Sequence, residues 1–539
     1  MGDKPIVLMP EDIQRVMGKD AQRNNILAAR MVSEMIKTTL GPKGMDKMLV
    51  SPTSEIIVTN DGVTILDEMQ IEHPAAKMMV DIAKTQEDEV GDGTTTAVMI
   101  AGKLLENAEK LLDKKIHPTV ITRGYRLAAE KSQEILKQIS LRITPQDQDI
   151  LKQIAMTAMT GKGAEGFKEK FAEIIVKAVM QVQNGGYISS LSDIKIEKSK
   201  GDGIQDTELI SGIVLDKEKI SEDMPSIVYD ARIALIDFPL ELKNPEIDTK
   251  ISISSPEQLQ GFLEQEERTI KEMIEKVKSS GANVVFCQKG IDDFAQYLLS
   301  KSGIYACRRV AKSDMEKMAK ATGGKIVSNL KELGSEELGN AGVVREVKHG
   351  EDNLTYIEEC KNPKALTILI HGGTEHVIDE IERAMKDGLG DVISSLKYGL
   401  VVPGGGAIEI ELAKRLREFS QELSGREQLA VEEFASALEF IPTTLAENAG
   451  MDPIDVLTEL KSRHDSGEKN AGLNLFTNRV ENVLEARIIE PLKIKSQAIS
   501  SASEVAIMIL RIDDVIASEE NSKKRGSRGI NYPGMPEEY

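Results

Sequence analysis

The segment VGDGTTTAVMIAGKLL (Val90–Leu105) begins as a glycine-flanked turn and continues as an apolar helix. Free backbone N–H groups and the positive end of the helix dipole favour an anion at such a start. Asp92 occupies the turn, however, and a carboxylate repels phosphate unless a divalent cation such as Mg²⁺ lies between them. The segment alone is compatible with two structures: a Mg²⁺–phosphate site, or a helix that Asp92 merely caps through the Thr95 N–H.

Length and composition narrow the class of protein. A chain of 539 residues with a net charge of −20 predicts several domains and argues against a partner as anionic as nucleic acid. No apolar run approaches the ~18 residues of a membrane span, and the first residues lack the apolar core of a signal peptide. The three cysteines form no CxxC pair, which fits a reducing compartment. We therefore expect a cytoplasmic protein with neither nucleic acid nor membrane as partner.

Around the opening segment, both ends of the chain have helical periodicity. Apolar residues at helical spacing predict a helix over 20–39, which Gly41 and Pro42 end. The runs KMLV (47–50) and EIIVT (55–59) predict a hairpin, and Asp452-Pro453 predicts a helix start. Further helices are expected over 74–89, 94–112 and 117–139. The polar tail over 522–539 is predicted to be disordered.

The centre of the chain alternates between strands and helices. Short apolar runs at 283–288, 304–310 and 324–329 are separated by helical patterns at 291–302 and 313–321, which is typical of a parallel α/β sheet. A long amphipathic helix over 256–279 precedes them. Before that helix, three isoleucines stand among polar residues without an obvious strand partner: Ile247, Ile251 and Ile253.

Glycine-containing turns punctuate the chain at 40–44, 60–62, 91–93, 160–163 and 404–406, and each alone is ordinary turn chemistry. Gly161–Gly166 also matches GxGxxG, the dinucleotide-binding fingerprint. We reject that interpretation, because the preceding residues 149–160 have helical and not strand periodicity. No Walker A sequence occurs, and HGGTEH (371–376) is interpreted as a strand-to-helix turn, not a metal site.

Taken together, the motifs of this chain resemble those of the group II chaperonins from about Asp20 to Ala517. The eleven matching segments occur in the family's order: TTLGPKGMDKMLV, TNDGVTIL, EHPAAKM, EVGDGTTTAV, TGKGAE, FCQKGIDD, ECKNPKA, GGTEH, GGGA, LAENAGMDP and EPLKIKSQAI. The resemblance implies an ATP-driven folding chamber of two stacked rings, built from this chain or from paralogous subunits, that encloses non-native proteins.

The resemblance also implies a multidomain fold of three nested domains. A mostly α-helical equatorial ATPase domain would take residues 1–145 and 405–521. A small α/β intermediate hinge domain would take 146–213 and 372–404, and an α/β apical substrate-binding domain would take 214–371. A helical protrusion over about 243–273 would form a built-in lid, with the three isolated isoleucines as lid contacts.

Site residues follow from the matching motifs. The resemblance implies that Asp92 ligates the Mg²⁺ of bound ATP, that Asp387 in MKDGLGDV activates the attacking water, and that Asp61 supports that water. It also implies that Lys162 reaches the γ-phosphate. The other nucleotide contacts would be Leu40, Gly41, Pro42, Gly93, Thr94, Thr95, Thr96, Thr160, Gly161, Gly405, Gly472 and Glu490.

The chain departs from the family pattern at His371, where Arg is expected, at Pro403, and in a tail without Gly-Met repeats. None of these departures removes an implied ATP ligand. Two other functions stay open at this point: a soluble ATPase whose middle domain binds a specific small ligand, and a structural ring or filament subunit. A structural subunit would not need the acids Asp61, Asp92 and Asp387 or the lysine Lys162, so these residues argue against the ring or filament subunit.

Overall fold

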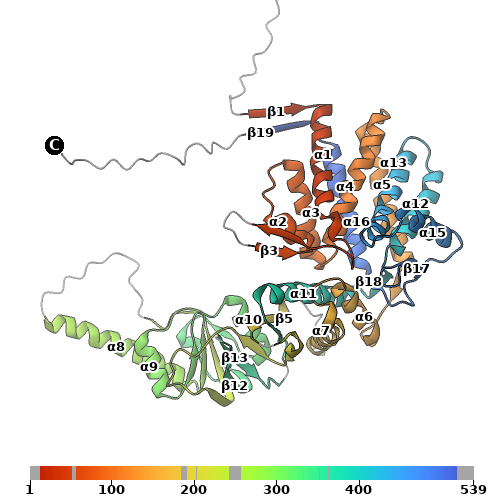
Figure 1. Ribbon diagram of the computed structural model, residues 1–539. Coiled ribbons are helices and arrows are strands. Elements are labelled where there is room, and N and C mark those ends of the chain that lie inside the picture. The colour runs from red at the N-terminus through yellow and green to blue at the C-terminus, as the bar shows by residue number, and fades with distance from the viewer. Residues whose placement is uncertain are drawn as a thin grey trace, which may run out of the picture.

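The computed structural model describes residues 13–50, 56–183, 191–201, 203–241, 256–350, 352–361 and 363–518. Figure 1 shows an elongated molecule in which a helical body carries both ends of the described chain and a sheet-containing body lies at the opposite end. A smaller middle region of helices and a short sheet lies between them. The fold is thus a multidomain arrangement of helices and sheets, as expected.

One hydrophobic core holds the helical body together, and α4 (Thr94–Asp113) runs through it. Ala97 to Ala101 are all at most 1% exposed, because α4 is surrounded by other helices and cannot present a polar face to water. The helices that contribute to this core are α1 (Lys19–Ile36), α2 (Gly62–Glu68), α3 (Pro74–Val90), α5 (Pro118–Ile139), α12 (Ala407–Glu422), α13 (Glu427–Leu438), α14 (Phe440–Asn448), α15 (Pro453–Asp465) and α16 (Leu492–Leu510).

Short antiparallel sheets complete this body. The predicted hairpin is confirmed as β2 (Lys47–Val50) and β3 (Ile56–Thr59). The two ends of the described chain pair through β1 (Ile13–Met17) and β19 (Asp514–Ser518). Strand β16 (Ala471–Asn474) pairs with β17 (Arg479–Asn482). The chain leaves the body through β4 (Leu141–Arg142) and returns through β15 (Leu400–Pro403), which pairs with both β4 and β18 (Ile489–Pro491).

The middle region has a hydrophobic core of its own. Its helices are α6 (Gln148–Met159), α7 (Lys168–Gln183) and α11 (Glu375–Tyr398), and its sheet has the order β5 (Ile194–Lys200), β14 (Leu366–Gly372), β6 (Glu208–Ile210). The helix α6 ends at Met159, so a helix and not a strand precedes Gly161, and the rejection of the dinucleotide fingerprint is confirmed. Residues 371–376 join β14 to α11, as predicted for HGGTEH.

The far body is built on one sheet, and the predicted parallel sheet is only half of it. Strands β8 (Ile227–Ile236), β9 (Val284–Cys287), β10 (Tyr305–Cys307) and β11 (Ile326–Val327) are parallel, with α9 (Asp293–Lys301) and α10 (Lys312–Thr322) between them. The remaining strands are antiparallel: β12 (Gly339–His349), β13 (Asp352–Glu358) and β7 (Ile213–Leu215). The predicted parallel arrangement of the strands between 283 and 329 is confirmed. The antiparallel strands were not predicted, and β12 and β13 form a hairpin that needs no helical crossover.

Helix α8 (Pro256–Ser279) matches its predicted bounds and extends outward from the far body (Figure 1). It is anchored at its C-terminal end by buried Ile270, Ile274 and Val277. The isoleucines 247, 251 and 253, the first part of the predicted lid and the predicted disordered tail lie outside the described residues.

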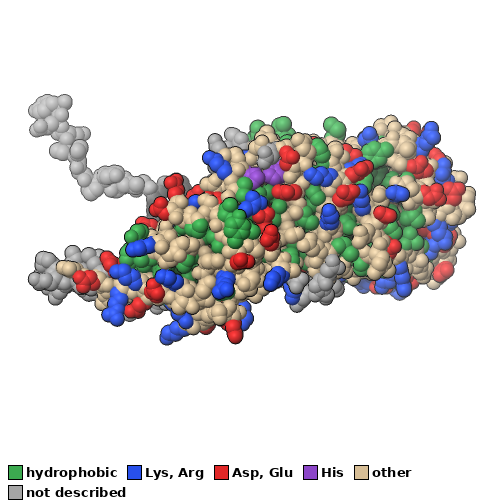
Figure 2. Space-filling view, turned by 90° about the horizontal axis from the view of Figure 1, so that it is seen from below, with side chains coloured by type: hydrophobic (Ala, Val, Ile, Leu, Met, Phe, Trp, Pro, Cys, Tyr) green, Lys and Arg blue, Asp and Glu red, His purple; other side chains and the backbone are tan. Residues whose placement is uncertain are grey.

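The surface is mixed in charge. Figure 2 shows acidic and basic side chains interspersed over the face in view, without a single-sign patch among the described residues of that face. No helix within the described ranges is long and apolar enough to cross a membrane.

Close packing between α1 and α4 generates a stability prediction. A Cβ at Gly102 of α4 would lie 2.4 Å from the Cβ of Ser33 on α1. We expect Gly102→Ala to lower the melting temperature, with an overpacking cost of about 1–3 kcal/mol that exceeds the gain in helix propensity. Gly166→Ala is the control, since nothing lies within 4 Å of a Cβ there. Differential scanning calorimetry of both variants tests this, and a Gly102→Ala variant as stable as the parent contradicts it.

Candidate active site

A pocket lies where the helical body meets the middle region, and most of the glycine turns of the sequence converge on it. Fourteen of the predicted site residues line it: Leu40, Gly41, Pro42, Asp61, Asp92, Gly93, Thr94, Thr95, Thr96, Thr160, Gly161, Lys162, Gly405 and Glu490. Asp387 and Gly472 are not among its lining residues. Asp387 nevertheless reaches the pocket by its bond to Lys162.

The turn before α4 is held in place by backbone geometry and by one glutamine. Gly93 has φ +81°, and a Cβ there would lie 2.6 Å from Cγ2 of Ile494 on α16. Gln86 of α3 donates from Nε2 to the carbonyl of Asp92 at 2.8 Å and to that of Ile494 at 3.3 Å. Among the described residues, no side-chain hydrogen bond caps the N-terminus of α4, so the N–H groups of its first turn are available to a ligand in the pocket.

Asp92 turns its carboxylate toward Lys162, with Oδ1 3.7 Å from Nζ. This position differs from the capping alternative, in which the carboxylate would accept from the Thr95 N–H. The side chain of Asp92 keeps 32% of its surface exposed, which leaves it accessible from the pocket.

Two other predicted loops are in direct contact with each other. Gly161 has φ +79°, and a Cβ there would lie 2.4 Å from Cα of Pro42. Asn60 donates from Nδ2 to the carbonyl of Gly161 at 3.2 Å, which joins a third loop to the pair. Glycine is therefore required at position 161, because these backbones approach more closely than any side chain permits.

Lys162 is the cation at the polar end of the pocket. Its ammonium hydrogen-bonds Asp387 of α11 and faces Asp92 of the turn before α4. Burial alone lowers the pKa of Lys162, but the carboxylates of Asp387 and Asp92 outweigh it and hold that pKa above its usual value. Lys162 therefore stays protonated and links the middle region to the helical body.

Further carboxylates surround this lysine. Asp61 caps α2, where its Oδ2 accepts from the Thr64 N–H at 2.9 Å and from the Thr64 hydroxyl at 2.6 Å, so it combines a turn role with a place in the pocket wall. Burial, followed by the charges of Asp61 and Asp92, raises the pKa of Glu87 to about 7. Burial, followed by Asp92 and Asp387, raises the pKa of Asp391 well above its usual value. The polar end is thus rich in negative charge.

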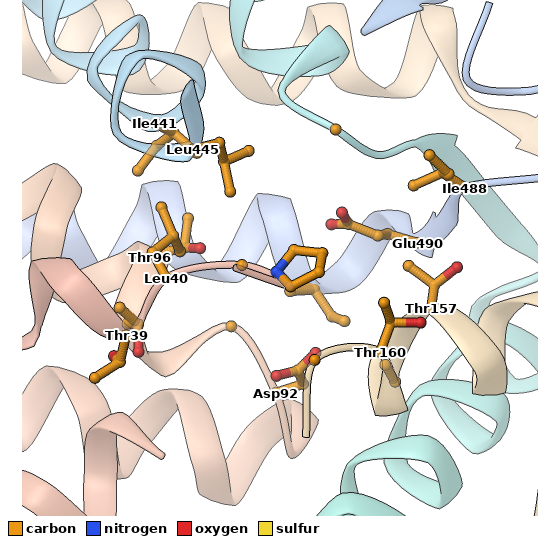
Figure 3. A pocket seen from close by; sticks show the side chains of 18 of the residues that line it. Thr39, Leu40, Asp92, Thr96, Thr157, Thr160, Ile441, Leu445, Ile488 and Glu490 are labelled. Atoms are coloured by element: carbon orange, nitrogen blue, oxygen red, sulfur yellow. The ribbon is translucent and has the colours of Figure 1, made fainter. Parts of the chain in front are cut away.

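The opposite side of the pocket is apolar. Figure 3 shows Ile441 and Leu445 of α14 across the pocket from Asp92 and Thr160. The other apolar lining residues are Leu40, Leu473, Leu475, Phe476, Ile488 and Ile494. A ligand with a flat apolar group at one end and anionic groups at the other matches this polarity.

Glu490 and the C-terminal glycines complete the wall. Glu490 accepts from Lys495 at 2.8 Å, and Lys495 also contacts Glu409 at 2.9 Å. The Gly405 carbonyl accepts from the Leu473 N–H at 2.8 Å. Gly472 lies behind this contact, where a Cβ would be 3.0 Å from the carbonyl oxygen of Gly404. The glycine at 472 therefore allows β16 to approach the glycine turn.

The sequence interpretation missed several lining residues. Asp391 follows Asp387 by one helical turn, so helical periodicity could have placed both acids on one face of α11. Ile441 and Leu445 share a face of α14 by the same rule. The other missed lining residues include Thr39, Asn60, Gly62, Thr157, Ala158, Gly406 and Lys495. Asn60, Gly62 and Gly406 lie in glycine turns that the sequence marks, whereas Thr157 and Ala158 carry no separate signal.

The donor set suits a magnesium–phosphate ligand better than a protein-only metal site. Within the described part of the chain, no group of three or more His, Cys, Asp or Glu side chains is arranged to hold a metal. Mg²⁺ needs only one or two carboxylates when phosphate oxygens and water complete its shell. Asp92, the N–H groups at the start of α4 and the hydroxyls of Thr94–Thr96 offer such a set.

Comparison with known proteins shows the family to which this chain belongs. The family model of the TCP-1/cpn60 chaperonins matches residues 32–520. A thermosome subunit of Methanopyrus kandleri is 57% identical over 523 residues, covering 96% of each chain. Thermosome subunit beta of Archaeoglobus fulgidus is 55% identical over 537 residues, covering 99% of this chain and 98% of the relative.

A solved structure gives the same result. The open-state monomer of a group II chaperonin from Methanococcoides burtonii matches with a TM-score of 0.59 and 48% identity, covering 78% of this chain and all of that one. The chain therefore belongs to the TCP-1/cpn60 chaperonin family and is an ATP-hydrolysing chaperonin subunit of the thermosome type.

Proposed function

We propose that this subunit binds and hydrolyses ATP in the pocket around Lys162, and that hydrolysis is coupled to movement of the middle region against the helical body. The contact of Lys162 with Asp92 on one side and Asp387 on the other carries the proposal. The two acids belong to different parts of the molecule, so the site is complete only when those parts are close.

In this proposal the polar end of the pocket holds the phosphates and the apolar side holds the base. Asp92 binds the Mg²⁺, which neutralises phosphate charge. The backbone N–H groups from Gly93 to Thr96 and the threonine hydroxyls bind phosphate oxygens. Ile441, Leu445 and Leu473 pack against the adenine, and Glu490 accepts hydrogen bonds from the ribose.

Hydrolysis then requires a positioned base more than covalent chemistry, because phosphoryl transfer depends mainly on orientation and charge neutralisation. Asp387 accepts the proton of the attacking water, and Asp61 orients that water. Lys162, once phosphate is present, exchanges part of its contact with Asp387 for the γ-phosphate. Closure between the two parts of the site thereby controls hydrolysis.

We further propose the three-domain division of the family for this chain. The equatorial domain takes residues 1–145 and 405–521, the intermediate domain 146–213 and 372–404, and the apical domain 214–371 with a lid over about 243–273. The separate hydrophobic cores of the helical body, the middle region and the far body support three domains. The boundary at 371/372 needs correction, because β14 pairs with β5 and β6 and packs in the core of the middle region, so we assign residues 366–372 to the intermediate domain. The subunits, identical or paralogous, form two stacked rings around non-native proteins, in the cytoplasm.

Replacing Asp387 tests the catalytic assignment. We expect Asp387→Asn to leave ATP binding near the parent value and to slow hydrolysis by roughly 10²-fold or more, the usual worth of a positioned general base. Asp379→Asn is the control, because Asp379 lies on the same helix but pairs with Lys198 at 2.9 Å, away from the pocket. Steady-state phosphate release measures turnover, and a fully active Asp387→Asn variant disproves the role.

Replacing Asp92 tests the metal assignment. Asp92→Ala removes the carboxylate that would hold Mg²⁺, so we expect Mg·ATP to bind the variant much more weakly than the parent, while metal-free nucleotide loses no ligand. Calorimetric titration of the variant and the parent with ATP, with and without Mg²⁺, measures the two affinities separately. If Mg·ATP binds the variant as tightly as the parent, Asp92 acts only in shaping the turn.

Assembly tests the chaperone chamber against a soluble single-chain ATPase. We expect the protein to elute in size-exclusion chromatography as a ring particle far larger than its 59.2 kDa monomer. We also expect it to protect a denatured, labelled substrate from protease when ATP and aluminium fluoride are added. A monomer that hydrolyses ATP and gives no protection would favour the single-chain ATPase.

A further inference from the structure

Asp391 is a buried acid of the pocket to which the proposed function assigns no role. It lies on α11 one helical turn after Asp387, is 2% exposed and lines the pocket. Its Oδ1 is buried and has no hydrogen-bond partner among the described residues. Burial of an unpartnered polar oxygen destabilises a folded protein, so its presence in the wall of a binding pocket indicates a partner that arrives with the ligand.

The charged groups around Asp391 do not supply that partner. Asp92 and Asp387 are acids, and Lys162 is already bonded to Asp387 and facing Asp92. Lys495, the other buried lysine of the pocket, is bonded to Glu409 and Glu490. Negative charge therefore exceeds positive charge at this end of the pocket before any phosphate binds.

A divalent cation would correct this excess. Mg²⁺ accepts one or two carboxylates in addition to phosphate oxygens and water. Asp92 approaches the pocket from the helical body and Asp391 approaches it from α11, so one ion can face both carboxylates when the two parts are close.

We propose that Asp391 is a second carboxylate of the Mg²⁺ site, in addition to Asp92. This inference rests on the proposed function, because it requires that Mg²⁺ enters this pocket with the nucleotide. It adds that the metal joins the helical body to the middle region, as the contacts of Lys162 also do.

The test uses Asp391→Asn in the assembled protein, because this change removes the charge and keeps the shape. Mn²⁺ replaces Mg²⁺ as a spectroscopic probe, and its binding in the presence of ADP is measured by electron paramagnetic resonance. We expect Mn²⁺ affinity to fall roughly ten- to a hundredfold, the range usual for residues that support a metal site. Binding of ADP without metal should stay at the parent value, and Asp391→Glu should recover part of the lost affinity.

Thermal stability without nucleotide distinguishes a metal role from a structural one. Since Asp391 has a buried, unpartnered oxygen, Asp391→Asn and Asp391→Val should melt at or above the temperature of the parent. A clear fall in melting temperature would show that Asp391 stabilises the folded chain and would overturn the inference.

Asp92→Asn and Asp379→Asn complete the design. If Mn²⁺ affinity falls in Asp92→Asn but stays at the parent value in Asp391→Asn, the inference is wrong and the proposed function stands. If neither variant loses Mn²⁺ affinity, the proposed metal site itself is wrong. Asp379→Asn, on the same helix outside the pocket, should behave as the parent in every measurement.

Discussion

The ion pairs of Lys162 are the contacts on which the organisation of this subunit depends. They join Asp387 of α11 to the turn that starts α4, and thus the middle region to the most buried helix of the helical body. Lys162 and Asp387 are 225 positions apart in the chain. The chain leaves the helical body at β4 and returns at β15, and the contact of Lys162 with Asp92 joins the two parts between these crossings.

Glycine makes this junction possible by letting backbones touch. Gly161 packs on Pro42, and Gly93 packs on Ile494 of α16. Both glycines have positive φ, so a side chain would be strained there as well as obstructed. The close approach brings backbone N–H groups and carbonyls to the pocket wall beside the lining side chains. Backbone N–H groups at the start of a helix bind phosphate oxygens, so this part of the pocket suits a phosphate group.

The acids of the site lower the stability of the folded chain, although they serve ligand binding. Acids gather around Lys162 in numbers that exceed the nearby positive charge, and burial and mutual repulsion raise the pKa values of Glu87 and Asp391. Such groups destabilise the folded chain, and a cation that binds there stabilises it by offsetting their mutual repulsion. Nucleotide with its metal is therefore expected to tighten the contact between the helical body and the middle region.

Much of this protein follows from its sequence alone. Apolar spacing predicted α1, α3, α4, α5 and α8 nearly to their ends, and Asp452 caps α15 through the N–H groups of Ile454 and Asp455 as its residue type indicates. Helical periodicity before Gly161 correctly excluded a dinucleotide fold. These features depend on neighbours within a few residues, so the local sequence pattern contains them.

Tertiary structure decided the rest: the antiparallel half of the far sheet, the contact of Gly161 with Pro42, and the presence of Asp391 and Asp92 in one pocket. Each of these depends on which distant segments pack together, and that is set by burial across the whole chain.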